Sequence, residues 1–145
     1  MLEQHYGDIH ITDELHSLLE RLLKDYELPT NAKRIVLNCR QMSYYRNRQG
    51  IHPIEVQLKR ESISSPWLIV CFTSFSYTSD NGTTVEPELY FHLINHWCYQ
   101  LESGTTHLSH HEAHDIFTHW MNAFYRHLSR HIFDNIQLSL IRTFN

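Results

Sequence analysis

The chain has 145 residues, a formal charge of −4 with histidine neutral, 41% apolar residues and 19% charged residues. This composition is too apolar and too aromatic for a disordered chain and is typical of a globular domain with a core. No apolar run reaches the roughly 18 residues that a membrane-spanning helix needs, and the first residues lack the pattern of a secretory signal. We therefore expect a single cytoplasmic domain over residues 1–145, in which residues 1–11 form a weakly ordered start.

The cysteine and histidine contents narrow the class of protein further. Three cysteines are too few, and odd in number, for a disulfide framework, and none belongs to a CxxC pair. This usage favours a reducing compartment, and the acidic charge gives no general attraction to nucleic acid. The thirteen histidines are an excess, and they predict a net charge that changes steeply near a pH of roughly 6.5.

The first half of the chain is expected to form a helix followed by strands. Leucines recur three and four residues apart from Thr12, the expected cap, to about Glu27, which predicts an amphipathic helix. Alternation with a period of two then predicts strands over residues 33–39 and 54–59. The next strand, over residues 67–77, is apolar on both faces in its first half, so we expect it at the centre of the sheet.

The second half is expected to add a hairpin, a long helix and a last strand. Residues 89–101 can form one long strand or a hairpin that turns at Asn95-His96, and the hairpin is preferred because the unbroken strand would be long. Ser109 and Glu112 have the spacing of a capping box for a helix that reaches about His131. Residues 136–140 alternate like a strand. This order predicts an α+β fold: a mainly antiparallel sheet of four to six strands, with an N-terminal helix and a long C-terminal helix packed on it.

Several short segments in the middle of the chain occur in a familiar order. They are Ser43-Tyr44, the run GIHPIEV over residues 50–56, Trp67, the run TSFSY over residues 73–77, and Pro87-Glu88-Leu89. Over roughly residues 35–100 the chain thereby resembles the bacterial domain-of-unknown-function family 2787. It departs from that pattern at Ile51, where the family tends to have an aromatic residue, and at Ser74, where it tends to have Asp. The resemblance implies a small bacterial α+β protein and assigns no activity.

Histidine pairs four residues apart are the candidates for a metal site. His127 and His131 fall on the expected C-terminal helix, where this spacing places two rings on one face, close enough to share a metal ion. A metal site needs at least a third ligand, and Asp134 is the only carboxylate nearby in the sequence. We therefore expect these histidines to pack at the margin of the core, with no metal and no cofactor bound.

His52 and Glu55 are the candidates for an acid–base pair. In a strand their odd separation points the two side chains to opposite faces, so they act together only if a bulge intervenes. No nucleophile elbow, P-loop or dinucleotide-binding fingerprint accompanies them, and four glycines are few for phosphate-binding loops. The residues therefore argue against an enzyme.

The connection over residues 40–48 places tyrosines beside arginines, a combination that can hold phosphate and stack bases. The acidic chain and the short patch argue against nucleic-acid binding, so the connection is interpreted as a solvated loop. The candidate ligand or interaction residues are Tyr44, Tyr45, Arg46, His52 and Tyr77.

The aromatic content of 12% has two interpretations. The simpler one is an aromatic-rich core, and the other is that some aromatic side chains lie at the surface as a contact patch. We therefore expect a domain that acts through contact with a protein partner, chiefly by self-association into a homo-oligomer, without catalysis. A small-ligand or metal-binding domain that uses the helix histidines is the alternative, and a small hydrolase-like enzyme is the second alternative.

Overall fold

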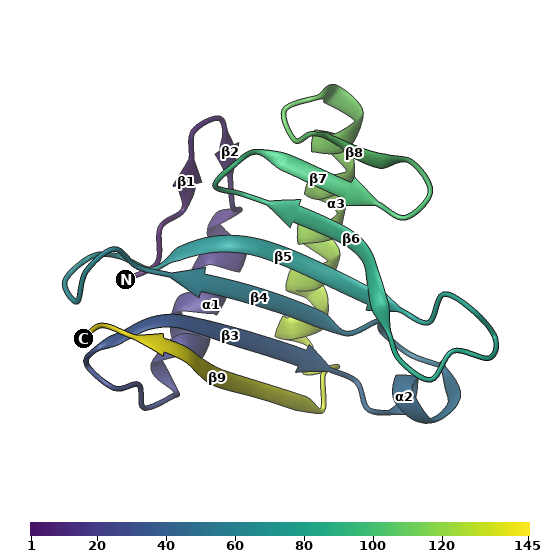
Figure 1. Cartoon of the computed structure of the whole chain (residues 1–145), viewed down its shortest axis with the longest axis horizontal. Helices are drawn as coiled ribbons and strands as arrows, with labels where there is room; N and C mark the ends of the chain where they lie inside the picture. The colour runs from purple at the N-terminus through teal and green to yellow at the C-terminus, as the bar shows by residue number, and fades with distance from the viewer.

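The computed structural model describes residues 1–145 and is built around a seven-stranded antiparallel sheet in the order β8-β7-β6-β5-β4-β3-β9 (Figure 1). A two-stranded hairpin precedes the first helix. The strands of the hairpin are β1 His5–Tyr6 and β2 Ile9–His10. The strands of the main sheet are β3 Ala32–Arg40, β4 Ile54–Lys59, β5 Leu68–Ser76, β6 Glu86–His92, β7 Trp97–Gln100, β8 Gly104–His107 and β9 Asn135–Thr143. The helices are α1 Asp13–Lys24, α2 Ser43–Asn47 and α3 His111–Ser129.

The expectation of a four- to six-stranded sheet with an N-terminal helix is wrong. The main sheet has seven strands, a second sheet has two, and α1 is preceded by the β1–β2 hairpin. β1 and β2 were not predicted because two residues are too few to show a period. β8 was not predicted because its sequence, GTTH, contains no apolar residue.

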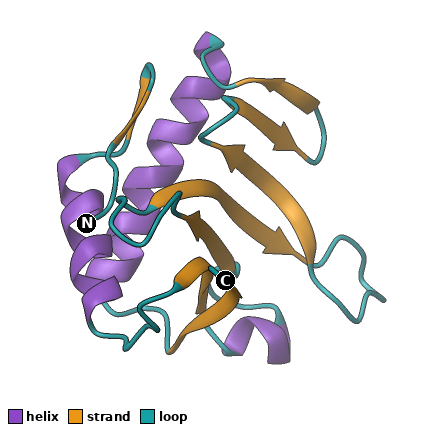
Figure 2. Ribbon diagram, turned by 60° about the vertical axis from the view of Figure 1, so that its left-hand side comes forward, coloured by secondary structure: helices purple, strands orange, loops and turns teal.

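Both long helices cover the same face of the sheet, and the opposite face carries no helix (Figure 2). The core lies between the helices and the sheet, and its centre is aromatic. Phe72 of β5 is fully buried, and its ring centroid lies 5.1 Å from that of Trp120 and 6.2 Å from that of Phe117, both on α3. None of the helices combines the length and the apolar character that crossing a membrane requires.

The two long helices begin in different ways. Thr12 caps α1 as its sequence predicts, because its hydroxyl accepts a hydrogen bond from the backbone N–H of Leu15 at 3.3 Å. The capping box expected at Ser109 does not form: the N-cap of α3 is His110, which makes no side-chain cap hydrogen bond. The hydroxyl of Ser109 instead hydrogen-bonds Nδ1 of His107 at 2.6 Å.

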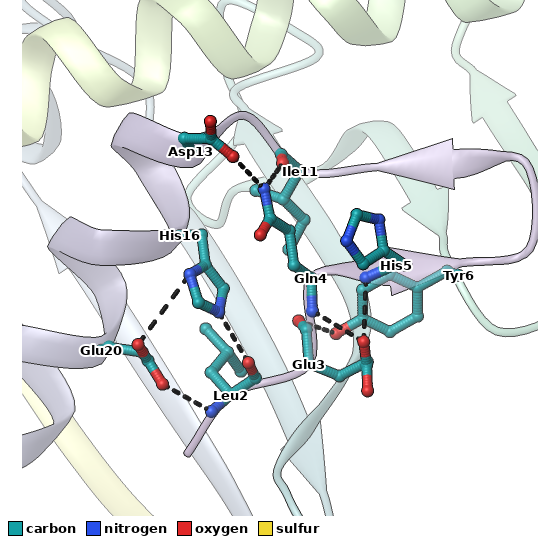
Figure 3. A network of polar contacts seen from close by, with 9 residues as sticks. All are labelled: Leu2, Glu3, Gln4, His5, Tyr6, Ile11, Asp13, His16 and Glu20. Carbon is teal, nitrogen blue, oxygen red and sulfur yellow. Dashed lines mark hydrogen bonds and ion pairs between the residues drawn. The ribbon is translucent and has the colours of Figure 1, made fainter.

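Residues 1–11, expected as a weakly ordered start, are tied to α1 by a polar network (Figure 3). The backbone N–H of Leu2 donates to the carboxylate of Glu20 at 2.9 Å, and Nε2 of His16 donates to the carbonyl of Leu2 at 2.6 Å. The side chains of Leu2 and Ile9 are buried in the core. The apolar residues of this segment thus complete the core at the end of the sheet where α1 begins.

Tyr6 joins the hairpin to the central strand of the sheet. Its hydroxyl accepts a hydrogen bond from the backbone N–H of Ile69 in β5 at 2.8 Å and donates to the carbonyl of Glu3 at 2.9 Å. Burial raises the pKa of Tyr6, which keeps the hydroxyl neutral and able to donate.

We expect Tyr6→Phe to lower the free energy of unfolding by about 1–3 kcal/mol, because the N–H of Ile69 stays buried and loses its acceptor. Urea denaturation followed by circular dichroism measures the change. Tyr125→Phe is the matched control, since the half-buried Tyr125 has no hydroxyl hydrogen bond within the chain. Equal stability of Tyr6→Phe and the wild type would contradict the assigned role.

Candidate functional site

The segments that carry the family resemblance meet at one end of the sheet. The run from Gly50 leads into β4, Ser74 lies near the end of β5, and Glu88 lies near the start of β6. Together with the second half of α3 they line a pocket of about 270 Å³. Its polar lining residues are His52, Ser74, Glu88 and His127. Its apolar lining residues are Ile51, Ile54, Leu89, Trp120, Ala123 and Phe124.

Glu88 is the centre of the polar wall of this pocket. Its Oε1 accepts hydrogen bonds from Nδ1 of His52 and from the hydroxyl of Ser74, each at 2.6 Å. Because a carboxylate can only accept, the contact places a proton on Nδ1 of His52. Nε2 of His52 has no hydrogen-bond partner within the chain, so it is available to a ligand.

A bulge in β6 places Glu88 in the pocket. Leu89 pairs with Ser74 and Pro87 pairs with Phe75, so Glu88 has no partner on β5. An unpaired residue of this kind locally bends its strand and redirects side chains. As a result, Glu88 and Leu89 line the same pocket, although neighbours in a regular strand point to opposite faces.

Gly50 shapes the approach to β4. Its φ of 110° is one that glycine adopts readily, and a Cβ at this position would collide with the side-chain amide of Gln41. That amide oxygen accepts a hydrogen bond from the backbone N–H of Ile51 at 2.7 Å. The turn therefore delivers the next residue, His52, to the pocket.

The ring of Tyr44 packs against the ring of His52. Tyr44 is buried, and its ring centroid lies 4.7 Å from that of His52 and 5.5 Å from that of Tyr77. Its hydroxyl accepts a hydrogen bond from the backbone N–H of Tyr77 at 3.1 Å. Tyr44, His52 and Tyr77, three of the predicted interaction residues, are thus brought together.

The other two predicted interaction residues lie apart from the pocket. Arg46 is exposed on the short helix α2, and Tyr45 is half-buried beside Arg40, with its pKa raised by burial. The guanidinium of Arg48 in the same connection donates to three carbonyls of residues 79–82 and lies 4.4 Å from the Tyr77 ring centroid. Arg48 therefore fastens two loops together.

The structure does not pair His52 with Glu55. Glu55 lies within β4 between two buried residues, and its carboxylate accepts a hydrogen bond from Nε2 of Gln57 at 3.0 Å. The partner of His52 is Glu88, 36 positions away, which the sequence analysis did not select. The Pro-Glu-Leu segment was the one signal in the sequence that pointed to it.

The second histidine of the predicted metal pair lies outside the helix. α3 ends at Ser129, and His131 is exposed, with a left-handed φ of 57°. The spacing of one helical turn therefore does not apply to His127 and His131. No group of three or more His, Cys, Asp or Glu side chains in the chain is placed to hold a metal ion.

Ser74, His52 and Glu88 do not have the arrangement of a catalytic triad. In a triad the histidine lies between the serine and the carboxylate and takes the serine proton. Here the hydroxyl of Ser74 donates to Glu88 and has no hydrogen bond to His52. The pocket therefore offers hydrogen-bond and proton acceptors rather than an activated nucleophile.

A second group of side chains lies on the face of the sheet that carries no helix. The rings of Tyr90 and Trp97 stack with centroids 4.9 Å apart, and His92 stacks on Trp97 at 5.5 Å. Tyr99 pairs with Tyr90 across β6 and β7. These half-buried rings lie outside the hydrophobic core cluster.

Comparison with known families matches residues 13–139 to a family described as "Protein of unknown function (DUF2787)", and thereby confirms the resemblance seen in the sequence. None of the curated proteins matches the chain.

Two solved structures from Vibrio cholerae share the fold. The hypothetical protein VC0508 of the VSP-II pathogenicity island has a TM-score of 0.84 and 21% identity, covering 97% of this chain and 100% of that one. The conserved hypothetical protein VC1805 of pathogenicity island VPI-2, from strain O1 biovar eltor N16961, has a TM-score of 0.79 and 23% identity, covering 96% and 100%. The latter is described as sharing structural homology with the human P32 protein.

His127, one of the two histidines that line the pocket, predicts how stability depends on pH. Burial lowers the pKa of His127, and the charges of Arg126 and Arg130 lower it further. The unfolded chain, with a histidine pKa of about 6.5, therefore takes up this proton at a higher pH than the folded chain does. The resulting stabilisation is present above about pH 6.5 and is lost as the pH falls through the lower folded value.

We expect the melting temperature of His127→Gln to fall less than that of the wild type between about pH 7.5 and about pH 5.5. Thermal unfolding followed by circular dichroism at both pH values measures the difference. His92, whose pKa burial also lowers, is present in both proteins, so its contribution cancels. The same pH dependence in both proteins would refute the lowered pKa of His127.

Proposed function

The chain belongs to the DUF2787 family, whose function is unknown, and we propose that it is a bacterial cytoplasmic interaction domain that pairs with a second copy of itself through β9. The observation that carries this proposal is the free edge of β9. Because the two solved structures are less than 25% identical to this chain, their likeness concerns the fold, and the proposal rests on this edge.

The two edges of the main sheet differ in length and protection. β8 has four residues, whereas β9 has nine. Natural edge strands are usually shortened, charged or interrupted by proline so that they do not pair with other chains. β9 contains no proline or glycine, and Arg142 is its only charged residue. Leu140 and Ile141 on this strand are 45% and 56% exposed.

The sequence of β9 is suited to pairing with itself. On the helix side of the sheet it presents Ile136, Leu138 and Leu140, which lie opposite buried residues of β3. An antiparallel pair centred on Leu138 would place Ile136 opposite Leu140 of the second copy, and Leu138 opposite itself. Such apolar cross-strand pairs stabilise a sheet, and the two-fold symmetry makes the contact the same for both copies.

The cysteines support the cytoplasmic part of the proposal. All three are free and buried, and no disulfide links any pair. Free thiols of this kind are usual in reducing compartments, whereas small secreted domains commonly depend on disulfides.

We expect untagged wild-type protein to be a dimer at micromolar concentration and Leu140→Lys to be a monomer. The substitution places a charge against Ile136 of the second copy, while in one chain the Leu140 side chain is already 45% exposed. Sedimentation velocity and native mass spectrometry measure the mass. An untagged protein is needed because added histidines can bind metal and bridge chains.

Ile63→Lys is the matched control, because Ile63 is 57% exposed and lies in the loop between β4 and β5, outside the β9 strand. It should remain a dimer. A monomeric wild type, or a dimer that survives Leu140→Lys, would rule out pairing through β9.

A further inference from the structure

The carboxylate of Glu88 has one oxygen without a partner in the chain. Oε1 accepts from both His52 and Ser74, and no hydrogen bond reaches Oε2. The only ion pair that includes Glu88 is the one with His52, so no lysine or arginine neutralises it. The Glu88 side chain is 22% exposed, and a carboxylate in such a setting forms strong hydrogen bonds with charged donors.

The rest of the pocket is suited to an organic group. Trp120 and Phe124 on α3 face the pocket together with Leu89 of β6 and Ile51 before β4. Sites for small molecules typically have such an apolar lining with a few polar groups that fix the orientation of the ligand. Since no group of three metal-binding side chains exists in the chain, a bare metal ion is a poorer match to this lining.

His127 completes the pocket opposite the sheet. Burial and the neighbouring arginines lower its pKa, so its ring is largely neutral near pH 7. A neutral imidazole adds a hydrogen-bond partner without adding positive charge. Glu88 therefore remains the group that sets the sign of the charge that the pocket prefers.

We propose that this pocket binds a small organic cation, in which an ammonium or amidinium group contacts Oε2 of Glu88 and an apolar ring lies against Trp120 and Leu89. The cation supplies a permanent positive charge, which no lysine or arginine of the chain places beside Glu88. A ligand carboxylate in the same position would be repelled by Glu88, so the site selects by charge as well as by shape. The inference does not depend on the pairing of β9.

The test compares three probes of nearly equal size: the cation benzylamine, the neutral benzyl alcohol and the anion benzoate. Each is titrated to millimolar concentration into ¹⁵N-labelled full-length protein, and amide shifts of residues that line the pocket report binding. We expect benzylamine to bind about tenfold or more tightly than benzyl alcohol, because one charge-assisted hydrogen bond is worth at least that factor. Benzoate should bind more weakly than benzyl alcohol.

Glu88→Gln should bind benzylamine and benzyl alcohol with about equal affinity, since the amide keeps the shape of the side chain and removes its charge. Glu55→Gln is the matched control: it makes the same change on β4, which β5 separates from β6, at a residue outside the pocket, and should leave the preference intact. Circular dichroism shows whether each variant is folded.

Ala123→Leu provides a test that leaves Glu88 untouched. Ala123 is half-buried on α3 and lines the pocket, so the larger side chain should fill the space and weaken all three probes together. The proposal is overturned if benzylamine causes no saturable shifts, if it binds no better than benzyl alcohol, or if Glu88→Gln keeps the preference.

Discussion

The packing of α3 against the centre of the sheet is the interaction on which the rest of the structure depends. Phe72 and Phe91, fully buried on the neighbouring strands β5 and β6, meet Phe117 and Trp120 of the helix, with Phe91 lying 4.9 Å from Phe117 and 5.4 Å from Trp120 between ring centroids. Because this contact fixes where the helix crosses the sheet, it also places His127 over the ends of the strands. The pocket is a consequence of that crossing.

Two departures from regular structure form the candidate site. Both lie at the end of the sheet where β4 begins, β5 ends and β6 begins. The bulge at Glu88 redirects a carboxylate that a regular strand would aim at the opposite face, and the turn at Gly50 presents His52 to it. These short segments position the polar groups His52 and Glu88, whereas the buried aromatic side chains of β5, β6 and α3 form the core beside them. Such a division is usual where a rigid scaffold supports a binding site.

The two faces of the sheet differ from each other, and so do its two edges. One face is covered by α1 and α3, whereas the other leaves Tyr90 and Trp97 half-buried without a helix above them (Figure 2). One edge ends in the short β8 and the other in the long, nearly uncharged β9. The proposed pairing through β9 and the proposed cation pocket use different parts of the chain, so a negative result for one does not affect the other.

Features that depend on near neighbours could be predicted from the sequence: the start of α1 at Thr12, the alternation of β4, the hairpin that returns as β7, and the family. The meeting of distant segments, and with it the number of strands, became known from the folded chain. The fold pairs His52 with Glu88 rather than Glu55, and it places β9 beside β3. The physical reason is that periods and caps act over a few residues, whereas register and bulges arise between strands far apart in the chain.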